Sequence, residues 1–117
     1  MEVHAITRNV RMSPQKMREV VRQIQGLAAT EASAVLAVVP RKGARVAAKT
    51  LKSAMANAED LKSHKPEFKD LKTDRLRVKE AVAQRGTILR RFTPKARGSA
   101  GPILKRQCHV KITLSDD

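Results

Sequence analysis

One segment of the chain concentrates more positive charge than a small folded body could hold by itself. Residues 85–107, "RGTILRRFTPKARGSAGPILKRQ", contain seven basic side chains, two prolines, three glycines and no acidic residue. Such a segment buries little apolar surface and repels itself, so alone it is expected to be disordered or to form a loosely held hairpin. The sequence therefore predicts that an anionic partner holds it.

The net charge of the whole chain points to the same kind of partner. The sequence has 25 Lys and Arg against 11 Asp and Glu, a formal charge of +14 on 117 residues. A field of this sign raises affinity for polyanions, so nucleic acid is the first candidate and an anionic membrane the second. No apolar run approaches the roughly 18 residues needed to span a bilayer, and no cleavable leader is recognisable. We therefore expect a soluble, unexported protein.

The sequence offers no residues for catalysis or for metal binding. Cys108 is the only cysteine and lies in an alternating pattern where a small apolar residue would also fit, so we expect it in the core. His4, His64 and His109 make no familiar metal-ligand spacing with Cys108. There is no nucleophile and base arrangement, phosphate-binding Gly-rich loop or carboxylate pair. We expect no enzymatic activity, no metal and no cofactor.

The first half of the chain has the pattern of three helices. In residues 13–26, Ser13 is a candidate N-cap, Pro14 suits the first helical position and Gly26 is a candidate left-handed stop. A second helix is expected from Thr30 to Pro40, and a third from Arg41 to about Leu61. The residues expected to face the core are Met17, Val20, Val21 and Ile24 in the first helix, and Ala44, Ala47, Ala48, Leu51, Met55 and Ala58 in the third.

The remaining segments have the two-residue period of strands. Residues 2–10 have the β-branched content of one strand. In the next, Leu76, Val78 and Val82 are expected to face the core, with Arg75, Arg77, Lys79 and Ala83 on the other side. In the last, Leu104, Cys108, Val110, Ile112 and Leu114 share the inner face. The order predicts one α+β domain over residues 1–117, with three helices on one face of a small antiparallel sheet.

The basic segment connects the last two strands and is predicted to be a long protruding β-hairpin. If Val78 pairs with Ile112, the centre of the hairpin falls at about Lys95. At ~3.3 Å per residue the strand from Val78 to Lys95 spans about 55 Å, whereas a domain of this size has a radius of gyration near ~13 Å. We call residues 85–106 the arm. Eight basic residues between Arg85 and Lys111 predict that the arm lies in a groove lined with phosphate.

Three separated stretches resemble one known family. They are "VRMSPQKMREVVRQIQG", "LKSAMANAE" and "RRFTPKARGSAGPILKRQCHV". They look like large-subunit ribosomal protein twenty-two in its bacterial form, over roughly Ala5 to Leu114, in the right order and with the right spacings. Ser99 departs from the arginine of many members, and "RQCH" stands where "RTSH" is usual.

The resemblance implies a fold and a set of partners. It implies a structural constituent that supports assembly of the large ribosomal subunit, with a small body on the outer surface of the subunit. An extended hairpin would pass through ribosomal RNA to the wall of the polypeptide exit tunnel. The implied partners are large-subunit rRNA, neighbouring ribosomal proteins and the nascent polypeptide, with no membrane and no homo-oligomer. The implied location is a cytoplasmic ribosome, with an organellar ribosome left open.

The basic residues and the resemblance together nominate two sets of site residues. The candidate rRNA-binding residues are Arg8, Arg11, Ser13, Lys16, Arg18, Asn57, Arg85, Lys105, Arg106, His109 and Lys111. The candidate tunnel-lining residues are Arg90, Arg91, Phe92, Pro94, Lys95, Ala96, Arg97, Gly98, Ser99 and Ala100. Phe68 and Phe92 are the only aromatic rings, so recognition is expected to depend on phosphate positions and RNA shape more than on base stacking.

Two other classes of function compete with this one. Composition alone also fits a small DNA-packaging protein that grips a duplex with a basic β-arm. A nuclease or protease is the weakest reading, because the acid or metal constellation that such chemistry needs is missing. The motif resemblance favours the ribosomal protein.

Overall fold

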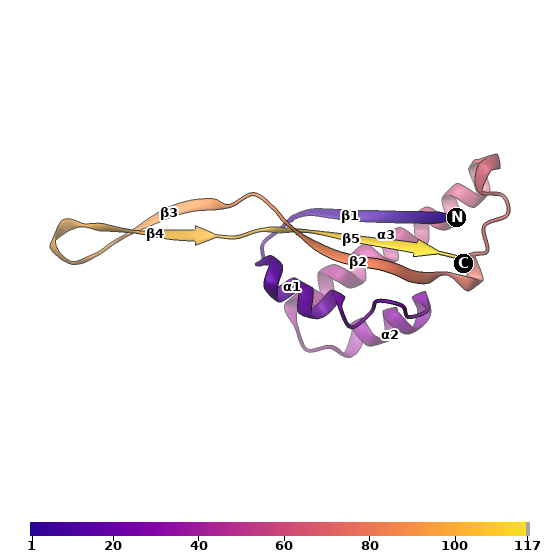
Figure 1. Cartoon of the computed structure of the whole chain (residues 1–117), viewed down its shortest axis with the longest axis horizontal. Coiled ribbons are helices and arrows are strands. Elements are labelled where there is room, and N and C mark those ends of the chain that lie inside the picture. Colours follow the sequence, from indigo (N-terminus) through magenta and orange to yellow (C-terminus); the bar gives the residue numbers. More distant parts are fainter. Residues whose placement is uncertain (117) are drawn as a thin grey trace.

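The chain folds into a small α+β body from which one long hairpin projects (Figure 1). A computed structural model describes residues 1–116. Within these residues the strands and helices, in chain order, are β1 (Glu2–Val10), α1 (Pro14–Val21), α2 (Ala29–Val38), α3 (Lys42–His64), β2 (Arg77–Arg85), β3 (Leu89–Pro94), β4 (Ala100–Lys105) and β5 (Cys108–Ser115). Single 3-10 turns occupy Pro66–Phe68, Thr73–Arg75 and Ala96–Gly98. The predicted α+β class is confirmed.

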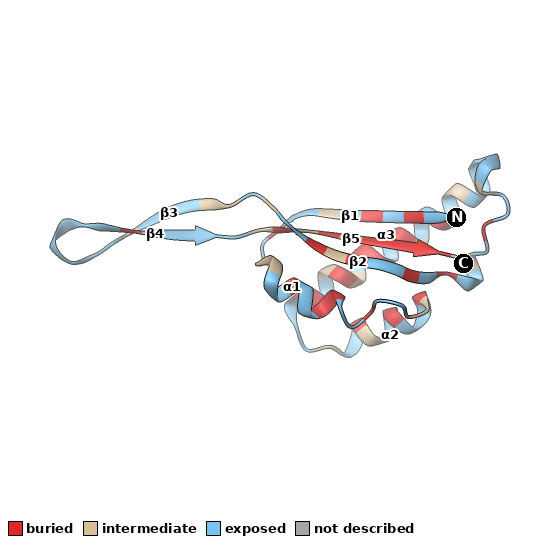
Figure 2. Cartoon of the chain, in the orientation of Figure 1, coloured by how far each residue is buried: buried red, intermediate tan, exposed pale blue. Residues whose placement is uncertain are grey.

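The body is built on a three-stranded antiparallel sheet in the order β1-β5-β2. The helices cover one face of this sheet (Figure 1). Figure 2 shows that buried residues fill most of β5 and recur along β1, β2 and the helices. The core joins Met17, Val20, Val21 and Ile24 of the first predicted helix to Val78, Val110, Ile112 and Leu114 of the sheet. Cys108 is fully buried beside them, as expected of a core residue.

Helix α1 begins as the sequence predicts and ends earlier. The Ser13 hydroxyl accepts a hydrogen bond from the Lys16 backbone nitrogen over 3.4 Å, and Pro14 occupies the first turn. The helix ends at Val21 rather than at Gly26. Gly26 does have a positive φ, +81°, but its N–H donates to the Val78 carbonyl over 2.9 Å. The chain leaves the helix early because this segment pairs with β2.

The other two helices lie close to their predicted bounds. Helix α2 begins at Ala29, one residue before Thr30, and ends before Pro40. Helix α3 continues to His64, three residues past the expected end. Ala44, Ala47 and Ala58 are buried at its interface as predicted, whereas Ala48 and Met55 are half-buried. Small side chains let α3 approach the sheet closely.

Two β-bulges change which side chains face the core. In β2 the register steps from Val78↔Leu114 to Glu80↔Thr113, so one extra residue is inserted at Lys79. The predicted alternation is therefore wrong after Lys79: Ala83 is buried and Val82 lies on the other face. In β1 a bulge between Thr7 and Val10 leaves Asn9 at φ 54°.

The arm extends far from the body. The molecule measures 67 × 28 × 16 Å with a radius of gyration of 17.7 Å, well above the ~13 Å of a compact chain of this length. Strands β3 and β4 form a separate two-stranded sheet whose register ends at Pro94↔Ala100, so its centre is Arg97 and not Lys95. The prediction paired Val78 with Ile112, whereas Val78 pairs with Leu114, and later steps in the register, including the bulge at Lys79, add the rest of the shift. Leu104, expected in the core, is 47% exposed on β4.

Candidate nucleic-acid interface

Basic side chains converge where the arm leaves the body. Two adjoining hollows of about 350 and 300 Å³ share Arg106 and Gln107 in their walls. The first is lined by Arg11, Leu89, Arg91, Lys105, Arg106 and Gln107. The second is lined by Ser13, Pro14, Gln15, Arg18, Arg85, Ile88, Arg106 and Gln107. We call these two hollows the arm root. Its lining includes six basic residues and no acidic one, which suits phosphate groups.

The backbone fixes the geometry of the arm root. Between β2 and β3 the Gly86 N–H donates to the Gln107 carbonyl over 2.9 Å. A Cβ at Gly86 would lie only 3.1 Å from the Gln107 carbonyl carbon and oxygen. The segments around Gly86 and Gln107 therefore approach closely, and a glycine fits there without a steric clash. This contact places Arg85, at the end of β2, near Arg106, in the connection between β4 and β5, and both line the same hollow as α1.

The start of α1 supplies the other wall of the arm root. The Ser13 cap fixes the first turn of the helix, and Arg18 lies one turn further along the same helix. The Nε of Arg18 donates to the backbone carbonyl of Ala83 over 3.3 Å, which holds the guanidinium beside β2. Six residues of the predicted rRNA-binding set therefore meet in one place: Arg11, Ser13, Arg18, Arg85, Lys105 and Arg106.

The other predicted rRNA-binding residues lie elsewhere on the body. Lys16 is exposed near the start of α1. Asn57 lies on α3, and its side-chain amide donates to the His4 carbonyl over 3.2 Å, so it also anchors β1. Arg8, His109 and Lys111 belong to the sheet face that the helices leave open. The Nδ1 of His109 accepts a hydrogen bond from the Asn9 backbone N–H over 3.0 Å. This gives a partner to a backbone donor inside the bulge of β1.

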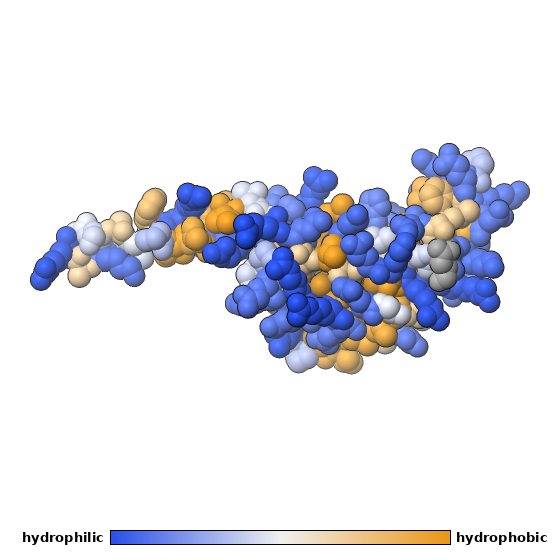
Figure 3. Space-filling model, viewed as in Figure 1, coloured by the Kyte–Doolittle hydropathy of each residue, from blue (hydrophilic) through white to orange (hydrophobic). Residues whose placement is uncertain are grey.

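The arm carries more exposed apolar surface than its sequence suggested (Figure 3). Phe92, Ile103 and Leu104 are 75%, 40% and 47% exposed. Because side chains alternate between the faces of a ribbon, the register places Phe92 opposite Pro102 and Leu104 opposite Arg90 on one face. Arg91 and Ile103 share the other. Both faces of the arm therefore mix basic and apolar groups.

The arm ends in a tight turn held by its own backbone. The Lys95 N–H donates to the Ser99 carbonyl over 2.6 Å, and the Ser99 hydroxyl donates to the Ala96 carbonyl over 2.8 Å. Arg97 and Gly98 both adopt positive φ, 61° and 72°. The tunnel-lining residues predicted at the tip are exposed from Pro94 to Ala100.

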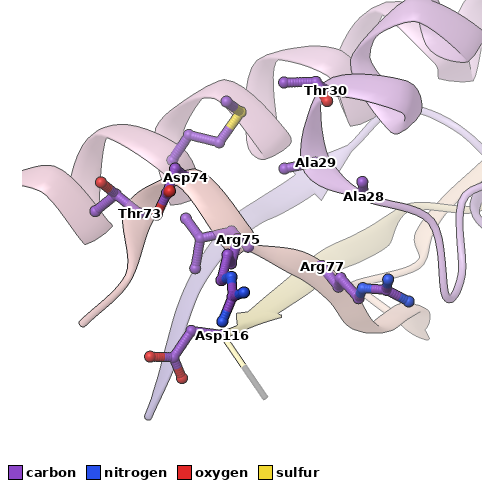
Figure 4. Close-up of a pocket in the computed structure, with 10 residues that line it drawn as sticks. Ala28, Ala29, Thr30, Thr73, Asp74, Arg75, Arg77 and Asp116 are labelled. Atoms are coloured by element: carbon purple, nitrogen blue, oxygen red, sulfur yellow. The ribbon is translucent and has the colours of Figure 1, made fainter. Parts of the chain in front are cut away.

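A third hollow, of about 500 Å³, lies at the opposite end of the body (Figure 4). Its lining combines Arg75 and Arg77 with Asp74 and Asp116, so its charge is balanced, unlike that of the arm root. Asp116 accepts hydrogen bonds from the Lys72 backbone nitrogen and from the terminal amine of Met1. These two donors hold the pKa of the Asp116 carboxyl below its usual value. Asp116 therefore connects Met1 and Lys72 at the edge of this hollow.

Residues 1–116 show no grouping that would hold a metal ion. No cluster of three or more His, Cys, Asp or Glu side chains occurs in that part of the chain. Burial raises the pKa of the Cys108 thiol, which makes it a poor nucleophile. None of the helices between residues 1 and 116 combines the length and the apolar character needed to cross a membrane.

Comparison with known proteins decides between the alternatives. The family described as "Ribosomal protein L22p/L17e" matches residues 5–115. The chain belongs to this family. A relative from Opitutus terrae, "Large ribosomal subunit protein uL22", is 50% identical over 99% of this chain and 96% of its own length. Relatives of the same name from Akkermansia muciniphila and Methylacidiphilum infernorum are 43% and 46% identical, over 99% of this chain and 97% and 96% of theirs.

Family membership makes the chain a structural protein of the large ribosomal subunit and not an enzyme. It removes the support for DNA packaging, which rested on composition alone. Sequence reasoning missed Gln15, Ile88 and Gln107, which line the arm root. The signal for Gln107 was its place opposite Gly86, which only the strand register reveals.

Proposed function

We propose that the protein binds large-subunit rRNA through the arm root and the open face of its sheet. Arg11, Arg18, Arg85, Lys105 and Arg106 would neutralise phosphates, and the Ser13 hydroxyl would lie beside them. The observation that carries this proposal is the convergence of six basic side chains, without an acidic one, around two adjoining hollows. By contrast, Arg41 on the body has an acidic partner, Glu19, at 2.7 Å.

We further propose that the arm passes between RNA segments and that its tip lines the polypeptide exit tunnel. A two-stranded ribbon is marginally stable in water, and this one exposes Phe92, Ile103 and Leu104. Surrounding RNA would cover these side chains and offset the charge of Arg90 and Arg91. The small exposed residues Ala96, Gly98, Ser99 and Ala100 would give a passing nascent chain little apolar surface to adhere to.

The rRNA contact is tested by the salt dependence of binding. Each neutralised phosphate contributes roughly 0.7 to 0.9 to the slope of log affinity against log salt. A Lys105→Ala, Arg106→Ala double variant is therefore expected to lower the slope by about 1.4 to 1.8 on transcribed large-subunit rRNA. The control variant is Lys62→Ala, Lys65→Ala, which removes the same charge from the far end of α3. Equal losses in both variants would contradict a specific role for the arm root.

The tunnel contact is tested by shortening the arm without changing its charge. Deleting Phe92 and Thr93 together with their partners Pro102 and Gly101 preserves strand alternation and removes about 7 Å of reach at ~3.3 Å per residue. A photo-crosslinker at position 95 is expected to label stalled nascent chains in subunits with the full arm and to lose that labelling in the shortened one. Unchanged labelling would contradict the placement of the tip, and rRNA affinity in the same samples reports the arm root separately.

A further inference from the structure

One stretch of this basic chain contains no basic residue. Residues 23–40 contain no Lys or Arg across 18 positions, although the chain has 25 such residues in 117. Helix α2 occupies most of this stretch, and its only charged residue is Glu31 in the first turn. A surface that faces phosphate groups needs positive charge. Helix α2 therefore lacks the positive charge that a phosphate-binding surface needs.

Helix α2 also exposes apolar side chains on the side away from the core. Ala29, Ala32 and Leu36 are buried against the body, whereas Ala34, Ala37 and Val38 are exposed. Val38 is 78% exposed, the highest value among the large apolar residues. A helix that is apolar on all sides is usually covered on all sides. Thr30, Glu31 and Ser33 make the exposed start of α2 polar, whereas its exposed C-terminal part, Ala34, Ala37 and Val38, has the composition of a buried surface.

A hollow of about 600 Å³ adjoins this face at the end of α2. Its apolar wall is formed by Leu36, Ala37, Val38, Val39 and Pro40, and its rim by Arg41, Lys42 and Arg45. We call this wall and rim the α2 patch. Arg41 is paired with Glu19 at 2.7 Å, whereas Lys42 and Arg45 are exposed and form no ion pair with any carboxylate of residues 1–116. The rim is thus able to take carboxylates from outside.

We propose that the α2 patch docks an acidic, apolar segment of another protein of the large subunit. An apolar side chain of that segment fills the hollow beside Val38, and neighbouring Asp or Glu side chains pair with Lys42 and Arg45. The proposal rests on membership of the large subunit and is independent of which side chains contact rRNA. The pattern of an apolar centre with a charged rim is that of a protein–protein interface.

Two other occupants fit the α2 patch less well. RNA would place its phosphates along the part of the surface that has no basic residue, and α2 has no aromatic ring on which a base could stack. A second copy of this chain would bring two molecules of charge +14 together, with Lys42 and Arg45 of each copy near those of the other, and like charges across an interface are unfavourable.

The occupant is identified by photo-crosslinking in assembled large subunits. The photoreactive residue p-benzoylphenylalanine replaces Val38 in one variant and Ala37 in another, because both side chains point outward and neither supports the core. The expected product is an adduct with another ribosomal protein, at a segment in which Asp or Glu lies within a few residues of the labelled apolar side chain. Adducts with rRNA, adducts with a second copy, adducts with a segment lacking acidic residues, or no adduct from either position would each overturn the proposal.

The charged rim is tested with a matched pair of variants. Changing Lys42→Glu and Arg45→Glu is expected to lower the yield of the Val38 adduct by about tenfold, because two attractive pairs become repulsive. The control, Lys49→Glu with Lys52→Glu, makes the same charge change at exposed positions further along α3 and is expected to leave the yield unchanged. Yields are normalised to the amount of the chain in the subunits. An equal decrease in both variants would overturn the pairing with carboxylates.

Discussion

The Nε of Arg18 lies 3.3 Å from the backbone oxygen of Ala83 and donates a hydrogen bond to it. Seven residues further along the chain, past the end of α1, the Gln25 amide donates to the Ala81 carbonyl over 2.7 Å. Both bonds give a partner to a carbonyl group on the outer edge of β2. On the same edge, Val78 accepts a hydrogen bond from the Gly26 N–H and donates one to the Leu27 carbonyl. An arginine nominated for RNA binding therefore also protects a sheet edge from unwanted pairing.

This double role separates two variants. Arg18→Ala and Gln25→Ala each remove one hydrogen bond to β2, so each is expected to lower the free energy of unfolding by about 0.5–1.5 kcal/mol. Only Arg18→Ala is expected to lower the salt slope of rRNA binding, by roughly 0.7 to 0.9. Thermal unfolding and filter binding on the same preparations measure the two effects. If Gln25→Ala lowers the slope equally, the loss comes from the fold and not from a phosphate contact.

The close approach at the arm root gives a second prediction. In Gly86→Ala the new Cβ would lie 3.1 Å from the Gln107 backbone, which cannot move aside as a flexible side chain could. We expect a destabilisation of about 1–3 kcal/mol, the usual range for overpacking. Chemical denaturation measures it. The control is Gly98→Asn at the open tip, where nothing lies within 4 Å and Asn tolerates the positive φ; a larger loss there would argue against the close contact as the cause.

The environment of Cys108 gives a third prediction. The side chain is fully buried in the sheet, and this burial raises the pKa of the thiol. Since the thiolate is the reactive form, iodoacetamide at neutral pH is expected to modify the folded protein far more slowly than the protein in urea. Mass spectrometry of timed samples gives both rates. Comparable rates would place Cys108 outside the core.

The sequence predicted the elements whose pattern is local. The Ser13 cap, the Pro14 start and the stripe from Met17 to Ile24 depend on residues within a few positions of each other, and the structure confirms them. The same holds for β5, where Cys108 to Leu114 alternate as predicted. Charge and the family resemblance nominated the basic residues of the arm root, and the structure shows that they converge there.

The errors arose where pairing between distant segments decides the outcome. The sequence around Lys79 alternates regularly and gives no sign of the extra residue inserted there. That insertion places Ala83, instead of the predicted Val82, on the inner face. The same uncertainty in register explains why the predicted centre of the hairpin was Lys95, whereas the observed centre is Arg97. Gly26 ended no helix because Val78, more than fifty residues later, pairs with it. The sequence predicts helix α2 but not which of its apolar side chains are exposed, since exposure on one side of an apolar helix depends on what packs against it.

The chain ends provide a prediction about pH. The Lys72 backbone N–H and the terminal amine lower the pKa of the Asp116 carboxyl in the folded state. A lowered folded pKa means that the stabilisation is fully present above the unfolded pKa, about 3.9, and is lost as the pH falls through the folded value. The melting temperature should therefore decrease below about pH 4 less steeply in Asp116→Asn than in the unchanged protein. Parallel curves would show that this carboxylate contributes nothing to acid sensitivity.

The arm should behave differently from the body when the protein is free of RNA. Strands β3 and β4 pair only with one another, and their apolar residues Phe92, Ile103 and Leu104 lie exposed instead of in a core. Because a two-stranded ribbon of this kind is marginal in water, its amides should exchange with solvent quickly, whereas those of β5, buried between two strands, should exchange slowly. Hydrogen exchange followed by mass spectrometry on the isolated protein measures both in one sample, with α3 as an internal standard. Adding large-subunit rRNA is expected to slow exchange in β3 and β4 while β5 changes little, since phosphate contacts order the arm only when RNA surrounds it.

Slow exchange in β3 and β4 without RNA would mean that the arm is rigid by itself. Rapid exchange that persists with bound RNA would mean that the arm remains outside the RNA.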